Sequence, residues 1–158
     1  MTLLYYSKSH ISDNQFVRPA LYPTAQDMDA IKKYTSQPYI CIAPASLWFT
    51  KQYPEAKWID FMSNVSSNLT VFLLGSAADV DFCNRIISAS GSKSCTNLAG
   101  KLTLMQSAAL MEYANMNFVN DSAPLHLASS VNAPVTAIFC STITDFGFGP
   151  LSSDAVVI

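Results

Sequence analysis

The sequence is poor in charge and has no excess of basic residues. Only 13% of its 158 residues are charged, and 9 lysines and arginines against 11 aspartates and glutamates give a formal net charge of -2. A nucleic-acid-binding protein meets the phosphate backbone with a basic patch, and no cluster of lysine or arginine supplies one in this sequence. The sequence therefore predicts no nucleic-acid partner.

Long hydrophobic runs and paired cysteines are also missing. The longest apolar runs, such as 71–74, are far shorter than the roughly 20 residues that cross a bilayer. The first ten residues have no basic region followed by a hydrophobic stretch, as a secretory signal would. The 4 cysteines include no C-x-x-C pair, so their spacing does not suit zinc. We therefore expect a cytoplasmic protein with no metal ion.

Apolar side chains are abundant and make up 50% of the residues. A chain of this length and composition can bury a core of ordinary size, so one domain is expected. Residues 1–23 lack a sustained hydrophobic period and contain Pro19 and Pro23, and we interpret them as a lead-in or interdomain segment. Residues 24–158 then form the domain.

Short apolar runs alternate with helical patterns through this domain. Strands are predicted at 39–43, 70–74, 94–98, around Phe118, at 135–139 and at 155–158. Cap residues before helical patterns, such as Thr24 and Thr103, predict where helices begin. Because βαβ units produce this alternation, the sequence predicts an α/β fold, a three-layer, Rossmann-like, doubly wound parallel sheet.

In such a sheet, every loop that leads from a strand to a helix emerges at one edge, where open α/β sheets bind their ligands. The loops expected at that edge are 44–53, 75–79, 100–103, 120–124 and 140–150. The candidate site residues lie in or just after these loops.

The central stretch is 118–128, which reads as a strand, a tight turn and a helix start. Pro124 falls where the helix begins, a position at which its missing N–H costs nothing. The unpaired backbone N–H groups of a helix start bind anions, phosphate above all. Asp121 can accept hydrogen bonds from hydroxyls beside them. The turn therefore predicts a ligand with phosphate and sugar, with the alternative that Asp121 and Ser122 are ordinary cap residues.

Two further loops offer groups for the same ligand. The ammonium of Lys51 suits a diphosphate and the Thr50 hydroxyl can donate to it, although a solvated lysine is the alternative. Asp79 stands where doubly wound nucleotide-binding folds often place an acid on ribose, although a helix-start acid needs no ligand. His126, one turn into the central helix, is expected to bond backbone or phosphate, with a general base as the alternative.

The loop 44–53 also carries aromatic side chains. Trp48, Phe49 and Tyr53 either stack on a base or sugar ring or fill the core. The loop at Gly75 lacks a G-x-G-x-x-G run, which argues against a nicotinamide dehydrogenase.

Four segments, 44–54, 73–75, 98–104 and 120–128, together resemble the donor-binding half of bacterial lipopolysaccharide heptosyltransferases, glycosyltransferase family 9. The resemblance runs from about Tyr39 to Pro150 in the same order and spacing. It implies one Rossmann-like half of a GT-B glycosyltransferase, in which two such domains face a cleft. It also implies transfer of heptose from ADP-heptose to growing lipopolysaccharide core, with inversion at the anomeric carbon.

Carried over by position, the resemblance implies roles around the diphosphate. Thr50 and Lys51 would lie by the diphosphate and heptose, and Ser122 and Ala123 would offer amides to the phosphates. Asp121 would hold sugar hydroxyls. No cofactor or metal is expected, because Lys51 and the amides of Ser122 and Ala123 would hold the diphosphate in place of a metal ion.

Around the nucleoside, the resemblance places Asp79 by the ribose and Leu104 or Met105 close to adenine. Ser46 and His126 complete the expected substrate-binding residues. The chain departs from the family by having Ala45 and Ala123 where glycine is usual, and a Cβ there limits how closely backbone approaches a phosphate.

In this family the acceptor site and the catalytic carboxylate base belong to an N-terminal domain, and nothing of that size precedes Tyr39. We therefore expect no catalytic residue in this chain, a lipopolysaccharide acceptor reached through the missing domain, and an inactive isolated chain. Surface that would face that domain favours self-association. The expected location is the cytoplasm, with a peripheral position at the inner membrane as an alternative.

Two other functions stay open. One is a non-catalytic α/β ligand-binding or interaction module, in which the acids and hydroxyls are only caps. The other is a different sugar-nucleotide enzyme of the same architecture.

Overall fold

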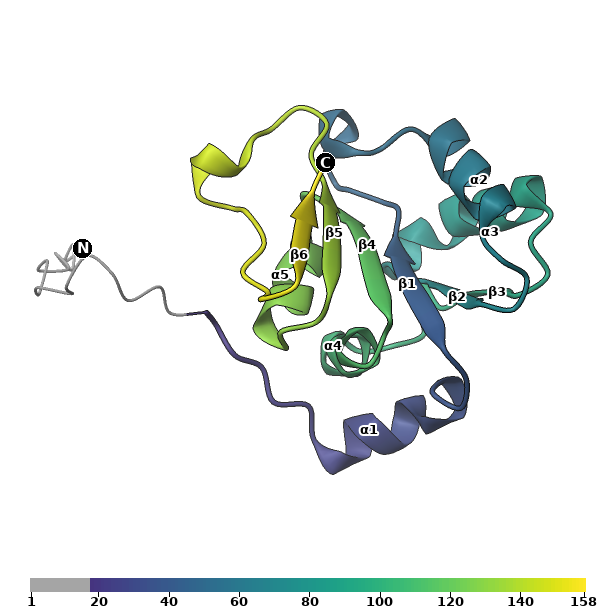
Figure 1. Ribbon diagram of the computed structural model, residues 1–158. Helices are drawn as coiled ribbons and strands as arrows, with labels where there is room; N and C mark the ends of the chain where they lie inside the picture. The colour runs from purple at the N-terminus through teal and green to yellow at the C-terminus, as the bar shows by residue number, and fades with distance from the viewer. Residues whose placement is uncertain (1–17) are drawn as a thin grey trace, which may run out of the picture.

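The computed structural model describes residues 18–158, in which six strands form one sheet in the order β3-β2-β1-β4-β5-β6 (Figure 1). All neighbouring strands are parallel. The strands are β1 (Tyr39–Ala43), β2 (Thr70–Leu73), β3 (Cys95–Asn97), β4 (Met116–Asn120), β5 (Val135–Ile138) and β6 (Ala155–Val157). The predicted doubly wound parallel sheet is confirmed.

Helices cover both faces of the sheet. On one side lie α1 (Ala25–Ile31), α4 (Leu104–Glu112) and α5 (Ala123–Ser130), and on the other lie α2 (Glu55–Asn64) and α3 (Val80–Ser90) (Figure 1). Alternate residues of β1 enter the two cores, Cys41 with the first set of helices and Ile42 with the second. Every residue of β1 is buried, as a strand covered on both faces requires. The three predicted layers are confirmed.

Cap residues set the helix ends. Thr103 and Gln106 form the predicted capping box at the start of α4. Gly91 ends α3 in the left-handed conformation, with φ of 66°. Three of the predicted loops contain short 3-10 helices that the sequence pattern did not indicate, η2 (Phe49–Lys51), η3 (Ala77–Asp79) and η4 (Thr144–Phe146).

Most of the expected lead-in, residues 1–17, lies outside the described residues. Its last part, 18–23, runs along the end of α5. The Arg18 guanidinium donates to the Ser129 carbonyl at 2.7 Å, and the Leu21 N–H donates to the Ser130 carbonyl at 3.1 Å. Among residues 18–158 no helix is both long and apolar enough to cross a bilayer.

The winding of the sheet reverses between β1 and β4. From β1 the chain adds β2 and β3 on one side, and β4, β5 and β6 lie on the other. Ala43, the last residue of β1, pairs with Val119, so the loop after β1 starts beside the end of β4. The loops that follow these two strands diverge and open a crevice, the usual ligand position of such folds.

Candidate functional site

A cavity of about 990 Å³ lies at the carboxyl edge of the sheet. Its wall is built from the segments that follow β1, β2, β3, β4 and β5, as the parallel arrangement predicts. Most of the candidate residues line it, namely Ser46, Lys51, Asp79, Leu104, Asp121, Ser122, Ala123 and His126. The expected convergence of distant loops on one site is confirmed.

Two candidates, Thr50 and Met105, are not among the residues that line the cavity. Thr50 lies in η2 next to Lys51, and successive side chains of a 3-10 helix are about 120° apart. Lys51 is half-buried and lines the cavity, whereas Thr50 is exposed, and its contact with a diphosphate stays a prediction. Leu104 and Met105 are likewise neighbours on α4. Of these two residues, Leu104 lines the cavity, and it is 69% exposed.

An ion pair joins the loops after β1 and β4. Lys51 Nζ lies 2.6 Å from Asp121 Oδ2, and the two side chains are 27% and 5% exposed. The Thr142 hydroxyl, from the segment after β5, donates to the same oxygen at 2.6 Å. Burial raises the pKa of the Asp121 carboxyl, but the hydrogen bonds from Lys51 and Thr142 and the charges of Lys51 and His126 outweigh it and hold that pKa below its usual value.

The side chain of Asn120, the last residue of β4, is hydrogen-bonded to both ends of the loop that carries Lys51. Its amide Nδ2 donates to the Pro44 carbonyl at 2.8 Å, and its Oδ1 accepts from the Tyr53 N–H at 3.0 Å. The side chain is fully buried, and a buried amide needs such partners. Asn120 therefore sets where Lys51 stands relative to Asp121.

The start of α5 is open to a ligand. Ser122 has extended backbone (φ -157°, ψ 178°), and its side chain makes no cap hydrogen bond. Within residues 18–158, no hydrogen bond is recorded from the backbone N–H of Ser122 or of Ala123, and Pro124 has no N–H. The two amides therefore remain available beside the Lys51 ammonium, in the positions at which a helix start binds phosphate.

Asp79 has a different set of partners. Its Oδ2 accepts from the N–H and from the hydroxyl of Ser76, both at 2.7 Å, in a capping box at the start of η3. This is the helix-start role that the sequence left open as the alternative. Asp79 also lines the cavity, and its role at a ribose stays a prediction.

Of the three aromatic side chains of the loop 44–53, one lines the cavity and one packs on the core, whereas Phe49 is 88% exposed and does not line the cavity. Trp48 lines the cavity and is 66% exposed, so its ring is free to stack on a ligand. Tyr53 instead packs edge-on against the buried Trp58, with ring centroids 5.2 Å apart. Phe148 and His126, which also line the cavity, lie edge-on to each other with ring centroids 6.4 Å apart.

The sequence interpretation assigned no role to Asn120 or Thr142. Asn120 ends an apolar strand, and a polar residue at such a buried position is itself a signal that it bonds neighbouring backbone. Thr142 lies in the segment 140–150, which was expected at this edge, but no local pattern connects its hydroxyl to Asp121.

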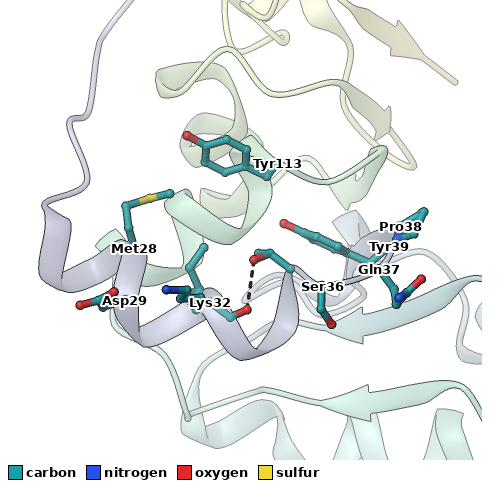
Figure 2. Close-up of a pocket in the computed structure, with 10 residues that line it drawn as sticks. Met28, Asp29, Lys32, Ser36, Gln37, Pro38, Tyr39 and Tyr113 are labelled. Atoms are coloured by element: carbon teal, nitrogen blue, oxygen red, sulfur yellow. Dashed lines mark hydrogen bonds between the residues drawn. The ribbon is translucent and has the colours of Figure 1, made fainter.

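A second hollow, of about 710 Å³, lies between α1 and the start of β1 (Figure 2). It is lined by residues from the stretch 28–39 and by Tyr113. Lys32 there makes no ion pair among the described residues. No group of three His, Cys, Asp or Glu side chains that could hold a metal ion occurs in residues 18–158. Charged and hydrogen-bonding groups from distant segments therefore gather at the carboxyl-edge cavity and not at this hollow.

Residues 6–158 match the family described as glycosyltransferase family 9 (heptosyltransferase). The chain is 30% identical over 154 residues to lipopolysaccharide heptosyltransferase 2 of Escherichia coli K12, a match that covers 89% of this chain and 44% of that protein. The solved structure of E. coli ADP-heptose lipopolysaccharide heptosyltransferase II aligns with a TM-score of 0.76 and 26% identity, over 92% of this chain and 46% of that one.

The family 9 glycosyltransferase of Veillonella parvula has the same fold, with a TM-score of 0.80 and 18% identity, over 88% of this chain and 42% of that one. This chain thus spans less than half the length of the relatives it matches.

Proposed function

Because the chain belongs to glycosyltransferase family 9, the heptosyltransferases, we propose that it is the donor-binding domain of an inverting heptosyltransferase-like enzyme. Its ligand is a nucleotide-diphospho-sugar of the ADP-heptose type, and the reaction it serves is heptose transfer in lipopolysaccharide core synthesis. The observation that carries this proposal is the meeting of Lys51 with the free amides of Ser122 and Ala123 on the wall of one cavity.

The diphosphate of the donor lies between Lys51 and the start of α5. When the bond from the sugar to the diphosphate breaks, negative charge builds on the leaving phosphate. The Lys51 ammonium, the two amides and the helix dipole stabilise this charge without a metal ion. The exposed Trp48 and Leu104 supply apolar surface on the same wall for the base.

The Lys51 ammonium already has a protein partner, which a bound donor would have to replace. Lys51 neutralises Asp121 at 2.6 Å, so a diphosphate competes with a carboxylate for the same ammonium. This competition predicts modest affinity for a nucleotide alone. A sugar hydroxyl that bonds Asp121 compensates for the lost ion pair, so the complete donor binds more tightly than its nucleotide.

The isolated chain binds the donor and transfers nothing. Both acids of the cavity are already engaged, Asp79 by Ser76 and Asp121 by Lys51 and Thr142, and neither is set to take a proton from an acceptor. The acceptor and the base belong to the rest of the enzyme.

All four cysteines are free, which supports a cytoplasmic location, at the inner membrane where the acceptor lies.

Exposed apolar side chains near the cavity support the expected self-association. Leu47 and Phe49 follow β1, and Phe146 follows β5, and all three are largely exposed.

Calorimetry with ADP, UDP and GDP at millimolar concentration tests the proposal on the folded chain. ADP is expected to give a binding heat that Lys51→Ala weakens by about 1 to 3 kcal/mol, the cost of losing a charge-assisted hydrogen bond. Lys32→Ala is the matched control, because Lys32 lines the other hollow. The proposal is wrong if folded protein gives no ADP-dependent heat, and preference for UDP or GDP would indicate a different sugar-nucleotide enzyme.

A further inference from the structure

Thr142 joins the site from a segment that supplied none of the candidate residues. It follows β5, it is half-buried, and its neighbours Ser141 and Ile143 are exposed. Its hydroxyl nevertheless donates at 2.6 Å to Asp121, whose side chain is only 5% exposed. A side chain of a solvent-facing segment is thus tied to the most buried charge of the cavity.

Thr142 and Lys51 bond the same carboxylate oxygen. Both contacts end at Oδ2 of Asp121, each at 2.6 Å. Within residues 18–158, Oδ1 accepts no recorded hydrogen bond. A carboxylate offers about two acceptor sites on each oxygen, so Oδ1 is the atom left for a ligand hydroxyl.

The two donors respond differently when a diphosphate enters. The Lys51 ammonium sits on a flexible stem and is attracted to the two phosphates. The Thr142 hydroxyl is neutral and short, and it stays with the carboxylate. Once Lys51 has turned to the diphosphate, Thr142 is the remaining protein donor that the structure records on Asp121.

We propose that Thr142 is a positioning residue for the sugar part of the donor. It holds Oδ2 of Asp121, so that Oδ1 faces a hydroxyl of the activated sugar after Lys51 has moved. The inference rests on the proposed function and goes beyond it, because it separates recognition of the sugar from recognition of the nucleotide. Thr142 controls the first and leaves the second unchanged.

The test compares Thr142→Val with Thr142→Ser in the 158-residue chain. Valine has nearly the shape of threonine without the hydroxyl, and serine keeps the hydroxyl. Calorimetry measures the affinity of each variant for ADP-heptose and for ADP. We expect Thr142→Val to weaken ADP-heptose binding about 10-fold, the size of one hydrogen bond to a charged group, with ADP affinity within about twofold. Thr142→Ser is expected to restore the wild-type preference.

Each of the other outcomes contradicts either this inference alone or the proposed function as well. If Thr142→Val lowers the affinity for ADP and ADP-heptose equally, Thr142 only supports the cavity wall and the inference is wrong. Unchanged ADP-heptose affinity in that variant, or no rescue by serine, is equally decisive against it. If wild-type protein binds neither ligand, the proposed function fails and the inference fails with it. Melting curves of the same samples show that each variant is folded.

Discussion

The turn after β2 and the turn after β4 each place an aspartate on the wall of the same cavity, yet the two acids are held in different ways. Asp79 is bonded by Ser76, three residues before it. Asp121 is bonded by Lys51 and Thr142, which come from the segments after β1 and β5. An acid with local partners stabilises the start of its own helix. The bonds of an acid with distant partners form only when the segments that supply those partners have come together.

This difference has consequences for what each acid contributes. A capping acid is worth about 1 kcal/mol of stability and needs no ligand. Asp121 is nearly buried, so its charge is tolerated because Lys51 and Thr142 satisfy it, and any ligand that draws Lys51 away must compensate. We therefore expect substitutions in the β2 turn to change stability and substitutions in the β4 turn to change binding.

The largest effect is expected from breaking the β2 turn. Gly100 has φ of +71°, and a Cβ added there would lie 2.9 Å from Ala77 Cα, a backbone atom of that turn. Gly100→Ala is expected to lower the free energy of unfolding by about 3 kcal/mol, from left-handed backbone strain together with this clash.

Gly91→Ala is the matched control, because Gly91 also has positive φ (+66°) but nothing lies within 4 Å of its added Cβ. We expect it to cost about 1 kcal/mol, the backbone strain alone. Urea unfolding measures both. Equal costs would mean that the contact of Gly100 with the β2 turn contributes nothing to stability.

Removing the charge of the β4 turn is expected to raise the affinity for ADP and to lower the preference for ADP-heptose. Asp121→Asn frees Lys51 and removes a negative charge from beside the phosphates, so ADP should bind about 3- to 10-fold more tightly. The preference for ADP-heptose over ADP should fall, because the sugar loses a carboxylate acceptor. Calorimetry with the two ligands measures both changes, and weaker ADP binding in this variant would contradict the proposed competition for Lys51.

The same contrast explains how much the sequence predicts. Asp79 and Ser76 are close in sequence, so the local pattern by itself indicates the helix-start role of Asp79 as an alternative. The helices, the strands and the meeting of their loops at one edge followed from hydrophobic period, cap residues and the geometry of parallel sheets. These features depend on neighbours in sequence or on rules common to the whole fold class.

The partners of Asp121 depend neither on neighbours in sequence nor on rules common to the fold class. The bond from Thr142 requires the path of the segment after β5, and the clamp by Asn120 requires the register of β4 beside β1. The sequence pattern also did not indicate that Thr50 and Lys51 lie in a 3-10 helix, in which neighbouring side chains diverge. The long-range hydrogen bonds of the site are therefore the part that sequence reasoning did not reach.

The smallest effect is expected at Asp79, and it decides between the two roles that the sequence left open. Asp79→Ala removes the capping box with Ser76 and should lower the free energy of unfolding by about 1 kcal/mol. ADP affinity should stay within about twofold, because Asp79 is held by its own turn and receives no recorded bond from the other segments of the cavity. Urea unfolding and ADP calorimetry on the same variant separate the outcomes. A tenfold loss of ADP affinity at unchanged stability would instead make Asp79 the ribose acid, and the turn after β2 would then bind ligand as the turn after β4 does.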